Sequence, residues 1–171
     1  MKRFSCQSCN HLVGFEATQC HYCGVTVGYL PEFATMTALE PQVDGTWLPL
    51  EKKARGQSRA FCINHAYGVC NWLTLVADNG ANSGFCVACQ FNRMIPNLNV
   101  PENKNRWYKL EVAKHRMFYT ILQLKLPFKN RRQDPENGLA FDFLDDAADG
   151  SVAIMTGHNN GIITIATKEA D

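Results

Sequence analysis

Residues 6–23 read CQSCNHLVGFEATQCHYC, and this stretch decides how the N-terminal part of the chain folds. It holds two Cys-x2-Cys pairs that are separated by ten residues. A two-residue gap lets a tight turn aim both thiolates at one cation, so two such turns can complete a tetrahedral sulfur site. Gly24, directly after the second pair, suits the reversed turn that such a knuckle requires. The spacing therefore predicts one metal site, with the ligands Cys6, Cys9, Cys20 and Cys23.

The remaining four cysteines form a second, less regular quartet. Seven residues separate Cys62 from Cys70, and fifteen more lead to another Cys-x2-Cys pair, Cys86 and Cys89. A seven-residue gap is too long for a single knuckle, so this quartet is a weaker metal signal. His65 offers an alternative ligand, because a set of three cysteines and one histidine also suits zinc. Since four cysteines are present, the sequence favours a second four-cysteine site made by Cys62, Cys70, Cys86 and Cys89.

Zinc, iron and disulfides are the alternatives for the two quartets. We expect two structural zinc ions, with rubredoxin-like iron as an alternative that uses the same knuckles. Disulfides require an oxidising compartment, and the start MKRFSCQSCN lacks the apolar run of a secretory signal. We therefore expect a cytoplasmic protein. Residues 1–30 hold too few large apolar side chains to fold alone, whereas a structural zinc ion can supply on the order of 10 kcal/mol.

Composition and charge set the broad class. The 171 residues, 46% of them hydrophobic and 19% charged, suit a soluble globular protein without a membrane-spanning segment. The net charge of +1 argues against nucleic-acid binding by bulk electrostatics. The charge is unevenly distributed, because residues 104–132 carry nine basic residues and one acid, whereas residues 134–171 carry eight acids and one lysine. We expect a solvated helix face beside an acidic sheet rim, with a phosphate-binding patch as the alternative.

The chain order predicts an α+β fold in three parts. Residues 1–30 form a zinc ribbon with Phe4, Phe15 and Tyr29 as cover, residues 31–58 form a linker that packs in places, and residues 59–171 hold the second zinc element, a helix and strands. Between Asn103 and Pro127 an apolar stripe with helical spacing predicts one long amphipathic helix; it comprises Trp107, Leu110, Ala113, Met117, Ile121 and Leu124. A small antiparallel sheet should follow, from LAFDFL (139–144), SVAIMT (151–156) and GIITIAT (161–167), with GHNNG (157–161) closing the last hairpin.

Several motifs together resemble one protein family. They are FCINHAYGVCNWLTLV (61–76), FCVACQFNRMIPNL (85–98), NRWYKLEVAKHRMFYTILQLKLP (105–127), GLAFDFL (138–144) and TGHNNGIITIATKEAD (156–171). As a set these motifs resemble the bacterial zinc-binding metallopeptidases that begin with a zinc ribbon. The resemblance covers nearly the whole chain and is weakest at residues 31–58. It implies a ribbon held by the first cysteine quartet and a second cysteine-rich element held by the other.

The resemblance also implies a catalytic helix, which this sequence does not contain. Such enzymes use the pattern HExxH, in which two histidines bind zinc and the glutamate acts as base. No HExxH occurs in the 171 residues, and His158 is the only histidine near the predicted strands. We therefore expect no catalytic residues here, and we expect the chain to be the N-terminal, inactive part of an enzyme that continues beyond Asp171.

A zinc-ribbon binding module for a protein or nucleic-acid partner is the alternative function. Nucleic acid is the less favoured partner, because the ribbon's basic residues are only Lys2 and Arg3. We also expect self-association through residues 161–167 if this β-branched strand is left as an exposed edge, unless the preceding hairpin hides it.

Overall fold

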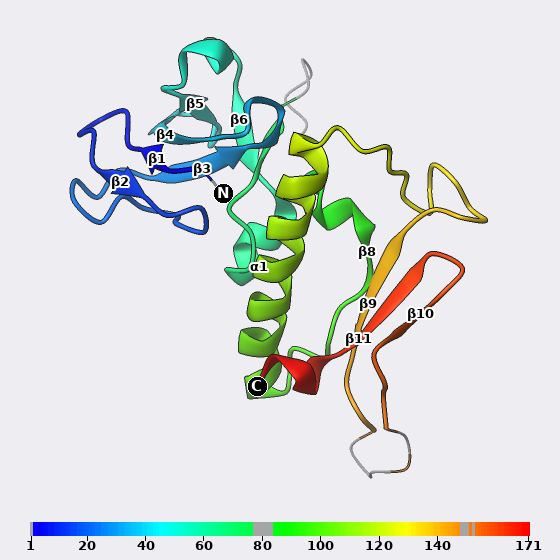
Figure 1. The fold of residues 1–171 in the computed structure, drawn as a ribbon. Helices are drawn as coiled ribbons and strands as arrows, with labels where there is room; N and C mark the ends of the chain where they lie inside the picture. The colour runs from blue at the N-terminus through cyan, green and yellow to red at the C-terminus, as the bar shows by residue number, and fades with distance from the viewer. Residues whose placement is uncertain (1, 77–83, 148–150, 152) are drawn as a thin grey trace. The chain divides into compact units, whose positions relative to one another are not determined.

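The computed structural model (Figure 1) describes residues 2–76, 84–147, 151 and 153–171. These residues belong to two compact units. Unit 1 is Met1–Cys86 and unit 2 is Val87–Asp171. The sequence predicted boundaries near residues 30 and 58, whereas the chain divides inside its last Cys-x2-Cys pair. The predicted α+β class, with a zinc ribbon and one long helix among the described residues, is confirmed.

Unit 1 begins with the ribbon, in which β1 (Phe4–Ser5) pairs antiparallel with β2 (Leu12–Val13). The three aromatic residues predicted as its cover are all buried. The Phe15 ring packs edge-on against Tyr29 with centroids 4.8 Å apart, and it lies 6.1 Å from the Phe4 ring. These rings form a small hydrophobic core beneath the ribbon, which its two-residue strands could not form alone.

The rest of unit 1 is an antiparallel sheet of five strands within residues 27–75, in the order β3-β4-β5-β6-β7. The strands are β3 (Val27–Leu30), β4 (Thr35–Pro41), β5 (Trp47–Pro49), β6 (Arg59–Phe61) and β7 (Leu73–Leu75). Short 3-10 helices occur at η1 (Pro31–Phe33), η2 (Lys52–Ala54) and η3 (Ile63–Tyr67). Residues 31–58, predicted as a packed linker, thus supply two strands of this sheet and several of its core residues.

The first and last strands of this sheet also meet each other. Tyr29 forms a parallel bridge with Trp72, and its backbone N–H donates to the Asn71 carbonyl at 2.9 Å. Gly28 permits this approach, because a Cβ at that position would lie 2.9 Å from the Leu73 side chain. The sheet therefore curls toward closure.

Side-chain amides fasten the ribbon to the sheet. Gln7 donates to the Met36 carbonyl at 3.0 Å and accepts from the Ala38 N–H at 2.7 Å. From the sheet side, Asn71 donates to the carbonyls of Phe15 and Ala17 at 2.8 and 2.9 Å. The ribbon is therefore an integral part of unit 1.

Unit 2 is organised around α1 (Pro101–Gln123), and Pro101 occupies its first turn, where a missing N–H costs nothing. The buried face of α1 differs from the predicted stripe. Ala113, Met117 and Leu124 are exposed, because the buried positions run through polar residues instead. The buried residues of α1 are Asn103, Trp107, Glu111, Lys114, His115, Phe118 and Tyr119. The helix is confirmed, but the orientation predicted for it is wrong.

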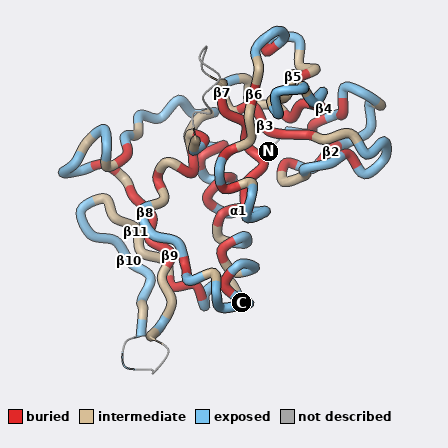
Figure 2. The backbone as a smooth tube through the Cα atoms, turned by 180° about the vertical axis from the view of Figure 1, so that it is seen from behind, coloured by how far each residue is buried: buried red, intermediate tan, exposed pale blue. Residues whose placement is uncertain are grey.

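The sheet of unit 2 has the order β10-β11-β9-β8 among the described residues. Its strands are β8 (Asn92–Met94), β9 (Ala140–Leu144), β10 (Gly157–Asn159) and β11 (Ile162–Ala166), and η4 (Cys89–Phe91) precedes them. An antiparallel hairpin includes the last strand, but its first strand β10 lies at Gly157–Asn159, inside the segment predicted as the turn. β9 runs parallel to both β11 and β8, whereas an antiparallel sheet was predicted. Figure 2 shows β9 largely buried and β10 exposed. Residues 153–156 are not a strand, contrary to the prediction for SVAIMT, and Val152 lies outside the described residues.

The strand expected as an exposed edge is covered on both sides. β11 lies between β9 and β10 (Figure 1), so the preceding hairpin hides it. Pairing between copies through this sheet would therefore involve its outer strands, β10 or β8. The chain then forms η5 (Thr167–Ala170), which lies against α1, with Arg106 in a bidentate ion pair with Asp171. This pair lowers the pKa of the Asp171 carboxyl through the Arg106 hydrogen bonds.

The turn before β9 leaves no space for a side chain at Gly138. A Cβ there would lie 2.3 Å from the Asn130 carbonyl oxygen and 2.5 Å from that of Asp134, and backbone atoms cannot rotate away. We expect Gly138→Ala to lower the free energy of unfolding by about 1–3 kcal/mol, measured by denaturant titration. Gly157→Ala is the matched control, because nothing lies within 4 Å of its Cβ position. Equal stability of the two variants would contradict the tight turn.

Candidate metal centres

The four sulfurs of the first cysteine quartet converge between the two knuckles of the ribbon. The Sγ atoms of Cys6 and Cys23 lie 3.8 Å apart and those of Cys9 and Cys20 lie 3.6 Å apart, and all four sulfurs lie within 4.8 Å of one another. Sulfurs bound to zinc at about 2.3 Å in a tetrahedron are about 3.8 Å apart, whereas a disulfide needs about 2.05 Å. The geometry therefore fits one tetrahedral metal ion, and all eight cysteines are free thiols.

The two knuckles of this site share one backbone hydrogen bond and one left-handed residue at equivalent positions. Asn10 and Gly24, each directly after the second cysteine of its pair, donate their N–H to the carbonyls of Cys6 and Cys20, both at 2.8 Å. Both adopt the left-handed conformation, with φ of 62° and 72°. Asparagine and glycine tolerate this region best, so the residue after each pair lets the chain turn back. The sequence identified Gly24 in this role but not Asn10.

Electrostatics distinguish the thiols of the first quartet. Backbone N–H groups of Cys23 and then Tyr22 lower the pKa of the Cys20 thiol to about 6. The His11 backbone lowers the pKa of Cys9, but burial and hydrogen bonds with the other three cysteines outweigh it and raise that pKa to about 12. Four thiolates thus repel one another without a cation, and metal binding must displace the remaining protons.

The second cysteine quartet is buried throughout. The sulfurs of Cys62, Cys70, Cys86 and Cys89 lie within 4.8 Å of one another, with 3.8 Å between Cys70 and Cys86. Backbone amides donate to these sulfurs: for example, the Trp72 N–H donates to Cys70 at 3.4 Å and the Cys86 N–H to Cys62 at 3.3 Å. Such N–H···S contacts stabilise metal-bound thiolates. This spacing also fits a tetrahedral ion.

A short helix spans the seven-residue gap that no knuckle could bridge. Cys62 is the N-cap of η3, and Gly68, with φ of 74°, ends it. His65 lies in η3, where its Nδ1 contacts the Cys70 carbonyl at 2.9 Å and its ring stacks on Phe61 with centroids 3.9 Å apart. In the described structure His65 thus supports the chain next to a ligand, and the sulfur quartet forms without it.

Sequence reasoning missed a third group, within unit 2. Ligand-type atoms of Cys89, Glu111 and His115 also lie within 4.8 Å of one another, and all three residues are buried. Glu111 forms an ion pair with Lys114 at 2.9 Å, although Lys114 was expected on the solvated helix face. The available signal was the i, i+4 spacing of Glu111 and His115, which places both on one face of α1.

The basic segment 104–132 makes many contacts within its own unit. Four of its nine basic residues make these contacts: Arg106 with Asp171, Lys109 with the Ala170 carbonyl, Lys114 with Glu111, and Arg131 with three backbone carbonyls. These charges are therefore partly neutralised or engaged. The arrangement differs from a free solvated face and gives a phosphate-binding patch little support.

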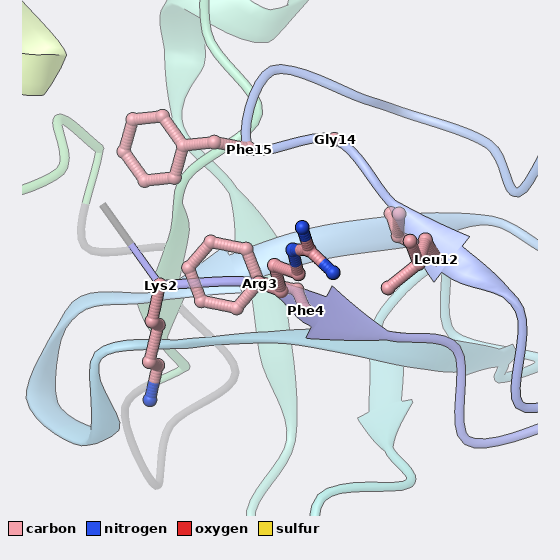
Figure 3. Close-up of a pocket in the computed structure, with 7 residues that line it drawn as sticks. Lys2, Arg3, Phe4, Leu12, Gly14 and Phe15 are labelled. Atoms are coloured by element: carbon pink, nitrogen blue, oxygen red, sulfur yellow. The ribbon is translucent and has the colours of Figure 1, made fainter.

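A shallow hollow of about 450 Å³ lies on the ribbon (Figure 3). Its lining residues are Lys2, Arg3, Phe4, Leu12, Val13, Gly14 and Phe15. Leu12 is exposed, and the Lys2 ammonium lies 5.6 Å from the centre of the Phe4 ring. Both basic residues of the ribbon thus border the same apolar hollow.

Two four-cysteine clusters on a ribbon and a small sheet define a zinc-ribbon protein, and comparison with known families agrees. Residues 3–100, more than half of the chain and including both quartets, match the zinc-ribbon domain family, and the chain belongs to that family. Residues 103–171 match a family described as "putative zinc-binding metallo-peptidase". The two quartets are therefore two structural zinc sites.

The relatives that the chain matches are longer proteins, and their names assign them no function. Uncharacterized proteins of Mycobacterium bovis and Mycobacterium tuberculosis are 29% identical over all 171 residues of the chain. The chain spans 44% of the length of these relatives. No solved structure matches it significantly. Within the described parts of the chain, none of the helices combines the length and apolar character that a membrane crossing requires.

Proposed function

We propose that this chain is the zinc-binding, non-catalytic region of a metallopeptidase-related protein and does not hydrolyse peptide bonds by itself. The observation that carries the proposal is the donor set of the two clusters. Each offers four cysteine sulfurs at tetrahedral spacing, so a zinc ion bound by all four has no open position. A metallopeptidase needs such a position to activate water and a carboxylate to accept its proton.

The role that follows is structural support. The first zinc ion closes the ribbon, whose strands are two residues long and cannot hold the knuckles alone. The second closes the segment from η3 to the last Cys-x2-Cys pair. The match of residues 103–171 to a metallopeptidase family supports placing this scaffold beside peptidase chemistry. A reducing compartment keeps eight thiols available for metal, so we assign the protein to the cytoplasm.

Casein digestion tests the inactivity of the chain. The zinc-loaded protein should release no more soluble peptide than a protein-free blank, while a zinc protease assayed in parallel digests the substrate. Digestion that a chelator abolishes, that zinc restores and that persists after repurification would contradict the proposal.

The hollow on the ribbon favours a second candidate function, in which the ribbon holds an acidic peptide segment of a protein partner. Lys2 and Arg3 beside exposed Leu12 combine positive charge with an apolar contact. Fluorescence anisotropy with a labelled poly-glutamate peptide should then show binding that Arg3→Glu abolishes. Binding of a single-stranded oligonucleotide but not of the peptide would instead indicate a nucleic-acid partner, and binding of neither would exclude this function.

A further inference from the structure

The buried thiol of Cys89 contacts α1 through two polar side chains. Its Sγ lies 3.6 Å from His115 Nε2 and 3.8 Å from Glu111 Oε2. All three residues are at most 4% exposed. They belong to unit 2, where η4 begins at Cys89 and α1 carries the other two.

Three side chains donate hydrogen bonds to the Glu111 carboxylate. It accepts from Trp107 Nε1 at 3.1 Å, from Asn92 Nδ2 at 2.5 Å and from Lys114 Nζ at 2.9 Å. Lys114 in turn donates to the Asn92 side chain and lies over the rings of Phe141 and Phe143. The side chains of the Lys114–Glu111 ion pair are inaccessible to solvent. The hydrogen-bond network therefore fixes Glu111 in one position.

A buried zinc site with four cysteine ligands needs such support. Four thiolates around Zn²⁺ leave a formal charge of −2 that burial makes unfavourable, and N–H donors to sulfur spread that charge. A zinc-bound thiolate has no proton and can only accept. At Cys89 the nitrogen that faces the sulfur is His115 Nε2, while the other ring nitrogen, Nδ1, faces Glu111 Oε2 at 3.8 Å.

We propose that His115 donates its Nε2–H to the zinc-bound thiolate of Cys89 and that Glu111, fixed by Lys114, orients the imidazole. His115 and Glu111 are then positioning residues for the second zinc ion. The inference rests on the second zinc site of the proposed function and adds to it the group that holds its last ligand.

A separate metal ion bound by Cys89, Glu111 and His115 is the competing interpretation. Their ligand atoms are close enough for one. However, such an ion would have to displace the Lys114 ammonium from the Glu111 carboxylate and would take Cys89 from the cysteine quartet. The ion pair already supplies the positive charge that the carboxylate needs, so the geometry favours hydrogen bonding over ligation.

Cadmium-113 NMR of the full chain tests the proposal, because each four-cysteine site gives its own resonance. In His115→Leu, which removes the donor, the resonance of the second site should shift, and this site should bind metal about 10- to 100-fold more weakly in a chelator competition. His115→Gln, whose amide can donate from a similar position, should restore most of both properties. The ribbon resonance is the internal control and should not move in any of these variants. Met117→Leu, on the exposed face of α1, is the matched variant and should leave both resonances and both metal affinities unchanged.

The other possible results would contradict either the role of His115 or the second zinc site itself. If neither resonance moves in His115→Leu, or if both move equally, or if glutamine behaves like leucine, the positioning role is wrong. A third bound cadmium ion in the wild-type chain would make the trio a metal site and overturn the proposal. A wild-type chain with only the ribbon resonance would refute the second zinc site itself, which is a failure of the proposed function.

Discussion

Replacement of Cys20 by serine is expected to abolish zinc binding at the ribbon and unfold residues 2–26, while α1 stays folded. Cys20 supplies the thiol with the lowered pKa and belongs to a quartet whose metal contributes on the order of 10 kcal/mol to folding. The ribbon strands are too short to survive that loss. Because Phe15 packs against Tyr29 and Trp72, the sheet of unit 1 should also lose stability.

Hydrogen exchange followed by mass spectrometry measures this result segment by segment. Amides of the ribbon should exchange within the shortest labelling time, whereas those of α1, in unit 2, should keep their protection. Ser8→Ala, at an exposed position inside the first knuckle, is the matched control and should leave both segments protected. Loss of protection in α1 together with the ribbon would show that the chain folds as one unit and would contradict the division at Cys86 and Val87.

Replacement of Lys114 by alanine is expected to lower the free energy of unfolding of unit 2 by about 3–5 kcal/mol, because it leaves the buried carboxylate of Glu111 without its counter-ion. The loss of the ammonium that lies over the rings of Phe141 and Phe143 adds to this effect. Denaturant unfolding monitored by the helix signal is the measurement, since α1 is the single α-helix of the described residues.

Two further variants make this prediction decisive. Lys104→Ala removes a lysine from the exposed side of the same helix and should change stability by at most about 0.5 kcal/mol. The double variant Lys114→Met with Glu111→Leu replaces the pair by apolar groups and should recover part of the stability lost in the single variant. Recovery is incomplete because Trp107 and Asn92 lose the carboxylate that accepts their hydrogen bonds. If Lys114→Ala behaves like Lys104→Ala, the buried ion pair does not stabilise unit 2.

The parts of the fold that depend on local spacing were predictable from sequence. The Cys-x2-Cys pairs identify the ribbon because a knuckle is formed by a few consecutive residues. Pro101 is an equally local signal, because proline favours the first turn of a helix, and α1 begins there. Residues 31–58 were harder to interpret, because prolines are typical of loops. In the structure Pro41 and Pro49 lie at the last positions of β4 and β5.

The buried face of α1 could not be derived from hydropathy. Glu111, Lys114 and His115 are polar, so a pattern of apolar residues assigns them to solvent and turns the helix the wrong way. They are buried because they satisfy one another and Cys89, and these partners come from separate parts of unit 2. The parallel pairing of β9 with β11 likewise depends on contacts between segments far apart in sequence.

Native mass spectrometry of the full chain, purified under reducing conditions, tests the central claim most directly, because it counts the metal ions and the thiol hydrogens in one measurement. We expect the mass of one chain plus two zinc ions, with all eight cysteines accounted for as metal ligands and both ions lost on acidification. A mass with a single zinc ion, with iron in either site, or with hydrogens missing through disulfide formation would contradict the two structural zinc sites.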